Sequence, residues 1–60
     1  MGSRILVIDD SQEMINFFAA VLAPMGHEET GALDGEEAIE RFADELPDLV
    51  FVDLLLPRRD

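Results

Sequence analysis

Two uninterrupted apolar runs flank two stretches of helical periodicity. The runs Ile5–Ile8 and Leu49–Val52 are rich in β-branched residues, which is typical of strands that are buried on both faces. Between them, apolar residues recur at three- and four-residue spacing, as expected for helices with one face toward a core. The pattern predicts, in order, a strand at 4–9, a helix that follows Asp10 or Ser11 and ends near residue 25, a strand at 27–33, a helix from about 35 to 45 and a strand at 49–53.

Capping residues and helix-breaking residues mark the two ends of the first predicted helix. Asp10 or Ser11 is a suitable N-cap, and Glu13 follows Asp10 at the spacing of a capping box. Pro24 and Gly26 end the helix near residue 25. We expect its core-facing stripe to comprise Met14, Phe18, Val21, Leu22 and Met25, widened by Ile15 and Phe17.

The second helix follows a turn at Asp34-Gly35, where Asp34 and Glu37 again have capping-box spacing. Pro47-Asp48 ends this helix. Its inward residues are predicted to be Ala38, Ile39, Phe42 and Leu46. The strand before it, 27–33, is mostly polar and suits only a half-buried edge of a sheet.

Strands that alternate with helices of about ten residues indicate βαβ units and a parallel sheet. The two most apolar strands, the first and the third, are expected to be neighbours. The polar second strand then lies at an edge. The predicted fold is therefore α/β, with a βαβαβ arrangement and the parallel strand order 2-1-3.

A carboxylate follows each of the two apolar strands. Asp9 and Asp10 close the first strand, and Asp53 closes the third. Burying an unpaired charge is costly, so these residues are not ordinary core residues. In parallel neighbours both acidic ends emerge at the same edge of the sheet, where open α/β sheets bind ligands. Three carboxylates there favour a hard divalent cation such as Mg²⁺. The alternative role for Asp9 and Asp10 is capping of the following helix.

Composition narrows the classes of function. The chain has 60 residues, enough for one domain, and its formal net charge of -10 should repel nucleic acid and anionic membranes. It has no cysteine, and His27 is its only histidine, which argues against disulfides, a zinc cluster or a histidine-based catalytic dyad. No apolar stretch approaches the ~20 residues that span a bilayer. No signal peptide is evident, and we expect a cytoplasmic protein.

Three segments together resemble the receiver domain of bacterial two-component response regulators. They are Ile5-Leu6-Val7-Ile8-Asp9-Asp10-Ser11, Asp34-Gly35-Glu36-Glu37-Ala38, and the segment from Pro47-Asp48 through Asp53 to Pro57. The resemblance spans nearly the whole chain. It implies a flavodoxin-like fold and a role as a phosphoacceptor in phosphorelay signalling. A phosphoacceptor module of this kind is not an enzyme. Its implied partner is a histidine kinase or a phosphotransfer protein.

The resemblance also implies a role for each acidic residue. Asp53 would be the phosphoacceptor, a carboxylate nucleophile. Asp10 would bind Mg²⁺ directly and Asp9 through a water, while Asp53 and the backbone carbonyl of Leu55 would complete the protein ligands. Pro57 would shape the loop beneath the site.

The chain departs from the family in length. A receiver has five strands and five helices, so residues 1–60 are expected to form its N-terminal half, without strands 4 and 5 and helices 3 to 5. The family's Ser or Thr after strand 4 and its Lys after strand 5 are then missing, and the chain contains no lysine. We expect impaired phosphotransfer and Mg²⁺ binding that is weak or absent.

A half-domain would leave the edge of the third strand bare, which makes that edge a template for another chain. We expect a symmetric homodimer or higher oligomer joined there, with antiparallel pairing and the sheet order 2-1-3-3′-1′-2′. The alternative function is accordingly a non-catalytic structural unit that assembles through this strand.

Other α/β enzymes fit less well. A haloacid-dehalogenase-like phosphatase needs an Asp where Leu55 stands. A flavodoxin needs a phosphate loop rich in hydroxyl groups and glycine where this chain has Asp10-Ser11-Gln12. A dinucleotide fold needs glycines after the first strand, and none occurs between Gly2 and Gly26.

Overall fold

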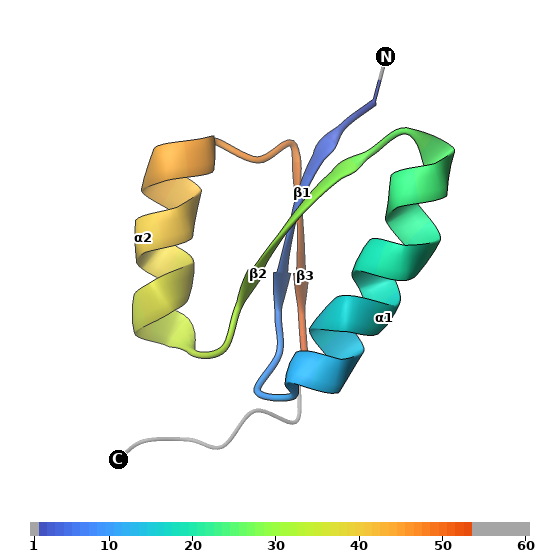
Figure 1. The fold of residues 1–60 in the computed structure, drawn as a ribbon. Coiled ribbons are helices and arrows are strands. Elements are labelled where there is room, and N and C mark those ends of the chain that lie inside the picture. Colours follow the sequence, from blue (N-terminus) through green and yellow to red (C-terminus); the bar gives the residue numbers. More distant parts are fainter. Residues whose placement is uncertain (1, 54–60) are drawn as a thin grey trace.

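Strands and helices alternate along the whole part of the chain that the structure describes, residues 2–53 of a computed structural model (Figure 1). The elements are β1 (Arg4–Ile8), α1 (Gln12–Leu22), a 3₁₀ turn η1 (Ala23–Met25), β2 (Glu28–Ala32), α2 (Gly35–Glu45) and β3 (Leu49–Val52). The predicted order of elements is confirmed. The bounds of α2 match the prediction, the ends of the strands differ from it by at most one residue, and α1 ends three residues before the predicted residue 25.

The three strands form one parallel sheet in the order β2-β1-β3. β1 is central, with Arg4 level with Glu28 on one side and Ile5 level with Leu49 on the other. The predicted α/β class and strand order 2-1-3 are therefore confirmed, and the polar strand β2 does lie at an edge. The reason is that β1 alone supplies three consecutive buried apolar residues, so it takes the position covered on every side.

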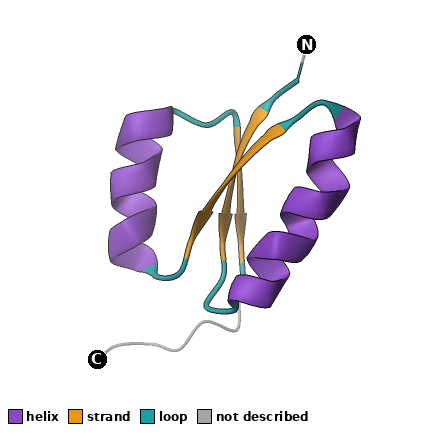
Figure 2. Cartoon of the chain, viewed as in Figure 1, coloured by secondary structure: helices purple, strands orange, loops and turns teal. Residues whose placement is uncertain are grey.

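The sheet lies between the two helices, with α1 on one face and α2 on the other (Figures 1 and 2). Alternate residues of β1 point to opposite faces and divide the core into two clusters. The first cluster contains Ile5, Val7 and Ile15, with Phe18 and Leu22 packed against it. The second contains Leu6, Ala32 and Ala38, with Ile8 and Val50 packed against it.

The face that α1 presents to the sheet differs from the predicted stripe. Ile15 is the buried residue of this helix, whereas Met14, Val21 and Met25 are exposed. The helix is rotated toward Ile15 because Gly31 of β2 leaves room for that side chain directly against the backbone. The α-helix also ends at Leu22 rather than near residue 25, and Pro24 lies in the 3₁₀ turn that follows.

Helix α2 contacts the sheet through a small residue. Ala38 is its buried position, while Ile39 is 73% exposed and Phe42 and Leu46 are also exposed. The prediction that these three larger residues point inward was therefore wrong, because a helix that approaches through alanine sits close to the sheet and leaves its flanks outside. The start of α2 is as predicted, since Asp34 accepts a hydrogen bond from the Glu37 backbone N–H at 2.8 Å.

Within residues 2–53 no helix has the length and apolar character needed to cross a membrane.

Candidate functional site

Backbone hydrogen bonds of the sheet place the acidic residues. The Asp9 backbone N–H donates to the Ala32 carbonyl oxygen at 3.0 Å, and the Asp53 backbone N–H donates to the Ile8 carbonyl oxygen at 2.9 Å. Ile8 is level with Val52 in the register of β1 and β3. Both aspartates consequently leave the sheet at the same level, at the carboxyl ends of neighbouring parallel strands.

The carboxylates of Asp9, Asp10 and Asp53 converge at this edge. One carboxylate oxygen of each residue lies within 4.8 Å of those of the other two. Asp9 is buried, with 7% of its surface exposed, Asp53 is half-buried and Asp10 is exposed. The cluster thus extends from the protein interior at Asp9 to solvent at Asp10, and a ligand can reach it from the exposed side.

Ser11 orients this cluster and begins the helix behind it. Its backbone N–H donates to Asp9 Oδ1 at 2.9 Å, which fixes the direction of that carboxylate. Its hydroxyl oxygen accepts from the Met14 backbone N–H at 3.3 Å and so caps α1. Since Ser11 is the N-cap, the capping role considered for Asp10 and its capping-box pairing with Glu13 are both wrong. The positive end of the α1 dipole also lies beside the carboxylates and favours their charge.

A cleft of about 390 Å³ opens over the cluster. Its lining combines polar residues, the three aspartates and Ser11, with apolar residues that include Met14, Phe18 and Phe51. The rings of Phe18 and Phe51 are stacked, with centroids 5.6 Å apart and planes 24° apart. This stack joins α1 to β3 two residues before Asp53. It forms an apolar part of the cleft lining and restrains the strand that ends at Asp53.

The set of donor atoms suits Mg²⁺. All three groups are carboxylate oxygens, the ligands that hard divalent cations prefer, and Mg²⁺ needs few of them because it keeps several waters. The only histidine, His27, lies at the amino end of the sheet, where its Nδ1 accepts from the Ser3 backbone N–H. Leu55 and Pro57, to which the sequence assigned a ligand and a loop-shaping role, lie outside the described residues.

The chain matches, over residues 5–60, the family described as the response regulator receiver domain. It belongs to this family. Receiver domains are regulatory phosphoacceptor modules of two-component systems rather than conventional enzymes, and they generally bind Mg²⁺ at an acidic pocket. Members of the family interact with histidine kinases or phosphotransfer proteins.

Two bacterial proteins and one crystal structure are among those similar to this chain. It is 37% identical over 60 residues to the alkaline phosphatase synthesis transcriptional regulatory protein PhoP of Bacillus subtilis, covering 25% of that protein. It is 34% identical over 58 residues to the chemotaxis protein CheY of Thermotoga maritima, covering 48% of it. The crystal structure of the N-terminal domain of a response regulator receiver protein from Methanoculleus marisnigri is similar with a TM-score of 0.88 at 34% identity, covering 97% of this chain and 47% of that one. The chain thus spans a quarter to a half of the length of these relatives.

Sequence reasoning missed the residues that support the site. Ser11 was considered only as a helix cap, although an acidic residue two positions before a backbone N–H is a recognisable turn pattern. Phe18 was assigned to the core without a partner, and Phe51 was assigned only to a strand. No sequence pattern pairs these two rings, because their contact depends on how α1 crosses the sheet.

Proposed function

We propose that this chain is a phosphoacceptor module of two-component phosphorelay signalling, with Asp53 as the residue that receives the phosphoryl group. The supporting observation is the position of the half-buried Asp53 carboxylate, within 4.8 Å of those of Asp9 and Asp10 and open to a cleft. Nucleophilic carboxylates that form acyl phosphates require such an accessible position beside a metal-binding set of oxygens.

In the proposed reaction an Asp53 carboxylate oxygen attacks the phosphorus of a phosphohistidine or of a small acyl phosphate. The bond from phosphorus to the donor breaks as the new oxygen–phosphorus bond forms, and the donor leaves with the bonding electrons. Asp10 would hold Mg²⁺ directly, Asp9 through a water, and Asp53 and the carbonyl of Leu55 would be its other protein ligands. Bound there, the metal supplies positive charge that offsets the charge of the carboxylates and the phosphoryl oxygens.

Two contacts hold the Asp9 carboxylate and the strand that ends at Asp53 in position before any phosphoryl donor binds. The Ser11 N–H holds the Asp9 carboxylate, and the stack of Phe18 on Phe51 holds the strand that ends at Asp53. Positioned groups of this kind lower the barrier because little reorganisation is left for the reaction itself.

We further propose that residues 1–60 correspond to the N-terminal half of a receiver domain, in line with their coverage of 47% and 48% of two relatives. A cytoplasmic location and a histidine kinase or phosphotransfer partner follow from the family. Residues 1–60 contain no lysine, so none of them can offer a lysine ammonium group to the phosphoryl group. Phosphotransfer by the chain alone is therefore expected to be slow and Mg²⁺ binding weak.

Incubation with acetyl phosphate and Mg²⁺, followed by intact mass measurement and peptide mapping, tests the proposal. We expect one phosphoryl group on Asp53, its loss in Asp53→Asn, and its retention in Asp44→Asn, which removes an exposed carboxylate of α2. Beryllofluoride with Mg²⁺ should shift the amide resonances of Asp9, Asp10 and Asp53. Modification that persists in Asp53→Asn, or a wild-type protein that responds to neither reagent, would contradict the proposal.

The outer edge of β3 favours a second candidate function, self-assembly. Among residues 2–53, β3 pairs with β1 alone, and Leu49, Phe51 and Val52 are 48%, 40% and 50% exposed. A strand with an open edge and apolar side chains is a template for another strand. We propose antiparallel pairing of β3 with β3 of a second copy, which gives the sheet order 2-1-3-3′-1′-2′. Sedimentation showing a folded monomer at micromolar concentration would exclude this role.

A further inference from the structure

The apolar pattern of β3 does not specify how this strand is aligned with β1. Leu49–Val52 is four apolar residues in a row, and its side chains on both faces remain partly exposed. A slip of one residue would exchange apolar side chains within the strand. It would bring Asp48 or Asp53 only to a terminal position, where Leu49 and Val52 are 48% and 50% exposed, so burial discriminates weakly between alignments.

Helices α1 and α2 pack mainly across β1 and β2. They reach β3 through two side chains, since Phe51 stacks on Phe18 and Val50 packs against the cluster that contains Ala38. An interaction at the start of β3 adds to these contacts in selecting the observed alignment.

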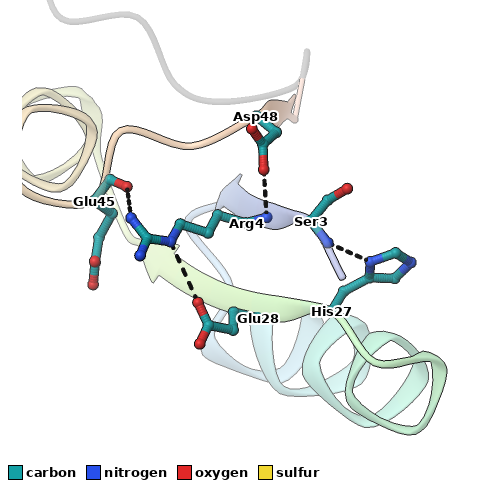
Figure 3. Close-up of polar contacts among 6 residues, drawn as sticks. All are labelled: Ser3, Arg4, His27, Glu28, Glu45 and Asp48. Atoms are coloured by element: carbon teal, nitrogen blue, oxygen red, sulfur yellow. Dashed lines mark hydrogen bonds and ion pairs between the residues drawn. The ribbon is translucent and has the colours of Figure 1, made fainter. Parts of the chain in front are cut away.

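Asp48 makes such an interaction at the start of β3. The Arg4 backbone N–H donates to Asp48 Oδ2 at 2.9 Å (Figure 3). The Asp48 backbone N–H donates to the Arg4 carbonyl oxygen at 2.8 Å. Backbone hydrogen bonds of a parallel sheet distinguish poorly between alignments, except where a proline lacks its N–H. The bond to the Asp48 carboxylate, in contrast, belongs to the observed alignment.

The neighbours of Asp48 cannot replace it. A slip of one residue places either Pro47 or Leu49 opposite Arg4. Neither has a side chain that accepts a hydrogen bond, and proline also lacks the backbone N–H. Each slip therefore leaves the Arg4 N–H without its carboxylate partner. The geometry points to Asp48 as the residue that fixes the alignment of β3 with β1.

The alignment chosen at Asp48 decides where the other end of β3 lies. In the observed alignment Asp53 donates its N–H to Ile8 and brings its carboxylate beside Asp9 and Asp10. A slip of one residue would move Asp53 by about 3.3 Å and turn its side chain toward the opposite face. Asp48 is thus a positioning residue for Asp53, about 16 Å away along the strand. This assignment rests on the proposed function only for the role of Asp53.

The side chain of Arg4 provides an internal control. Its Nη1 donates to the Glu45 carbonyl oxygen at 3.1 Å and its Nε lies 3.5 Å from Glu28 Oε2 (Figure 3). These contacts join β1 to the end of α2 and to β2. The pair with Asp48 uses only the Arg4 backbone, so Arg4→Gln removes the side-chain contacts and leaves that pair in place.

NMR of the full 60-residue chain tests the assignment through amide exchange, cross-strand contacts and Mn²⁺ broadening. In Asp48→Ala we expect the Asp53 amide to exchange at least about tenfold faster, while the Asp9 amide, which is bonded to β2, is unchanged. Cross-strand contacts from Ile5 to Leu49 should weaken. Paramagnetic broadening by Mn²⁺ should remain at Asp9 and Asp10 and weaken at Asp53. A general loss of stability would instead accelerate both amides equally.

The matched variants should behave like the wild type. Asp48→Asn keeps an oxygen that accepts from the Arg4 N–H and should restore exchange, cross-strand contacts and broadening. Asp44→Ala, which removes an equal charge from α2, and Arg4→Gln should leave the exchange of Asp53 unchanged.

Three results would overturn the assignment: native exchange at Asp53 in Asp48→Ala, loss of the alignment in Asp48→Asn, or global unfolding of Asp48→Ala while Asp44→Ala folds. The last would make Asp48 a determinant of the whole fold rather than of β3. If wild-type protein shows no Mn²⁺ broadening at the three aspartates, the metal site of the proposed function fails. The exchange and cross-strand data still decide the role of Asp48.

Discussion

The side chain of Ile15 rests directly on the backbone of Gly31, so that α1 meets β2 at a position where any β-carbon would overlap Cγ2 of the isoleucine. Ile15 is the buried residue of α1, and Val7, which shares its core cluster, is level with Gly31 in the sheet. This contact sets the distance between α1 and the sheet. At the start of the same helix, the Ser11 N–H holds the Asp9 carboxylate through a local hydrogen bond.

Gly31→Ala is expected to destabilise the protein by about 1–3 kcal/mol, because the added methyl group forces α1 away from the sheet. Urea unfolding followed by circular dichroism measures this change. A double-mutant cycle with Ile15→Ala should show that the two substitutions together cost less than the sum of each alone. Additive effects would show that the two residues do not share one contact. Gly35→Ala, at a position where a β-carbon meets no atom within 4 Å, is the control.

Phe51→Leu is expected to lower stability by roughly 0.5–1.5 kcal/mol, because leucine keeps an apolar side chain but loses the ring stack with Phe18. The exposed Phe42 of α2 has no aromatic ring against it among the described residues. Phe42→Leu should therefore cost less. Equal losses of unfolding free energy in the two variants would show that the stack contributes nothing beyond apolar contact.

Burial raises the pKa of the Glu29 carboxyl on β2, and its buried Oε2 has no hydrogen-bond partner within residues 2–53. The folded protein therefore holds this proton more tightly than the unfolded chain does. The resulting stability is fully present below the pKa of the unfolded chain and is lost as the pH rises through the raised pKa. Glu29→Gln should raise the melting temperature at neutral pH, where the charged form is penalised, and this advantage should vanish below about pH 4.

Thermal unfolding of Glu29→Gln and wild type across this pH range measures the difference, with Glu40→Gln, an exposed residue of α2, as control. A stabilisation of Glu29→Gln that stays constant down to acid pH would contradict the account, because an uncharged carboxyl no longer carries the penalty.

Asp10→Asn is expected to stabilise the metal-free protein and to reduce its stabilisation by Mg²⁺. Three carboxylates that converge within 4.8 Å repel one another, so removing one charge favours the fold when no cation is present. Mg²⁺ stabilises the native state more strongly the more tightly it binds, and its affinity falls when a ligand is lost. Melting temperatures in EDTA and in Mg²⁺ at low ionic strength measure both effects. An unchanged response to Mg²⁺ in Asp10→Asn, with Asp44→Asn as control, would remove Asp10 from the site.

Much of the fold could be predicted because its signals are local. Uninterrupted β-branched runs identified β1 and β3, and Asp34 with the following acidic turn identified the start of α2. The contrast between apolar β1 and polar β2 gave the order of the strands. These features depend on residues close together in the chain, so the amino-acid order contains them directly.

The helix faces could not be predicted as well. Both helices carry more apolar residues than one face can bury, so periodicity alone did not distinguish Ile15 from Met14 or Ala38 from Ile39. Small residues decided the outcome, namely Gly31 under α1 and Ala38 within α2. A close approach between layers selects which side chains fit, and that selection depends on the partner surface.

The sequence by itself determined that Asp9, Asp10 and Asp53 end neighbouring parallel strands, and therefore which edge of the sheet is acidic. Local geometry then selected Ser11 over Asp10 as the helix cap and held the Asp9 carboxylate through the Ser11 N–H. Only the tertiary structure decided the alignment of β3, through Asp48 and Arg4. The physical reason is that strand ends follow from local apolar patterns, whereas a hydrogen bond between residues 44 positions apart forms only after the sheet has brought them together.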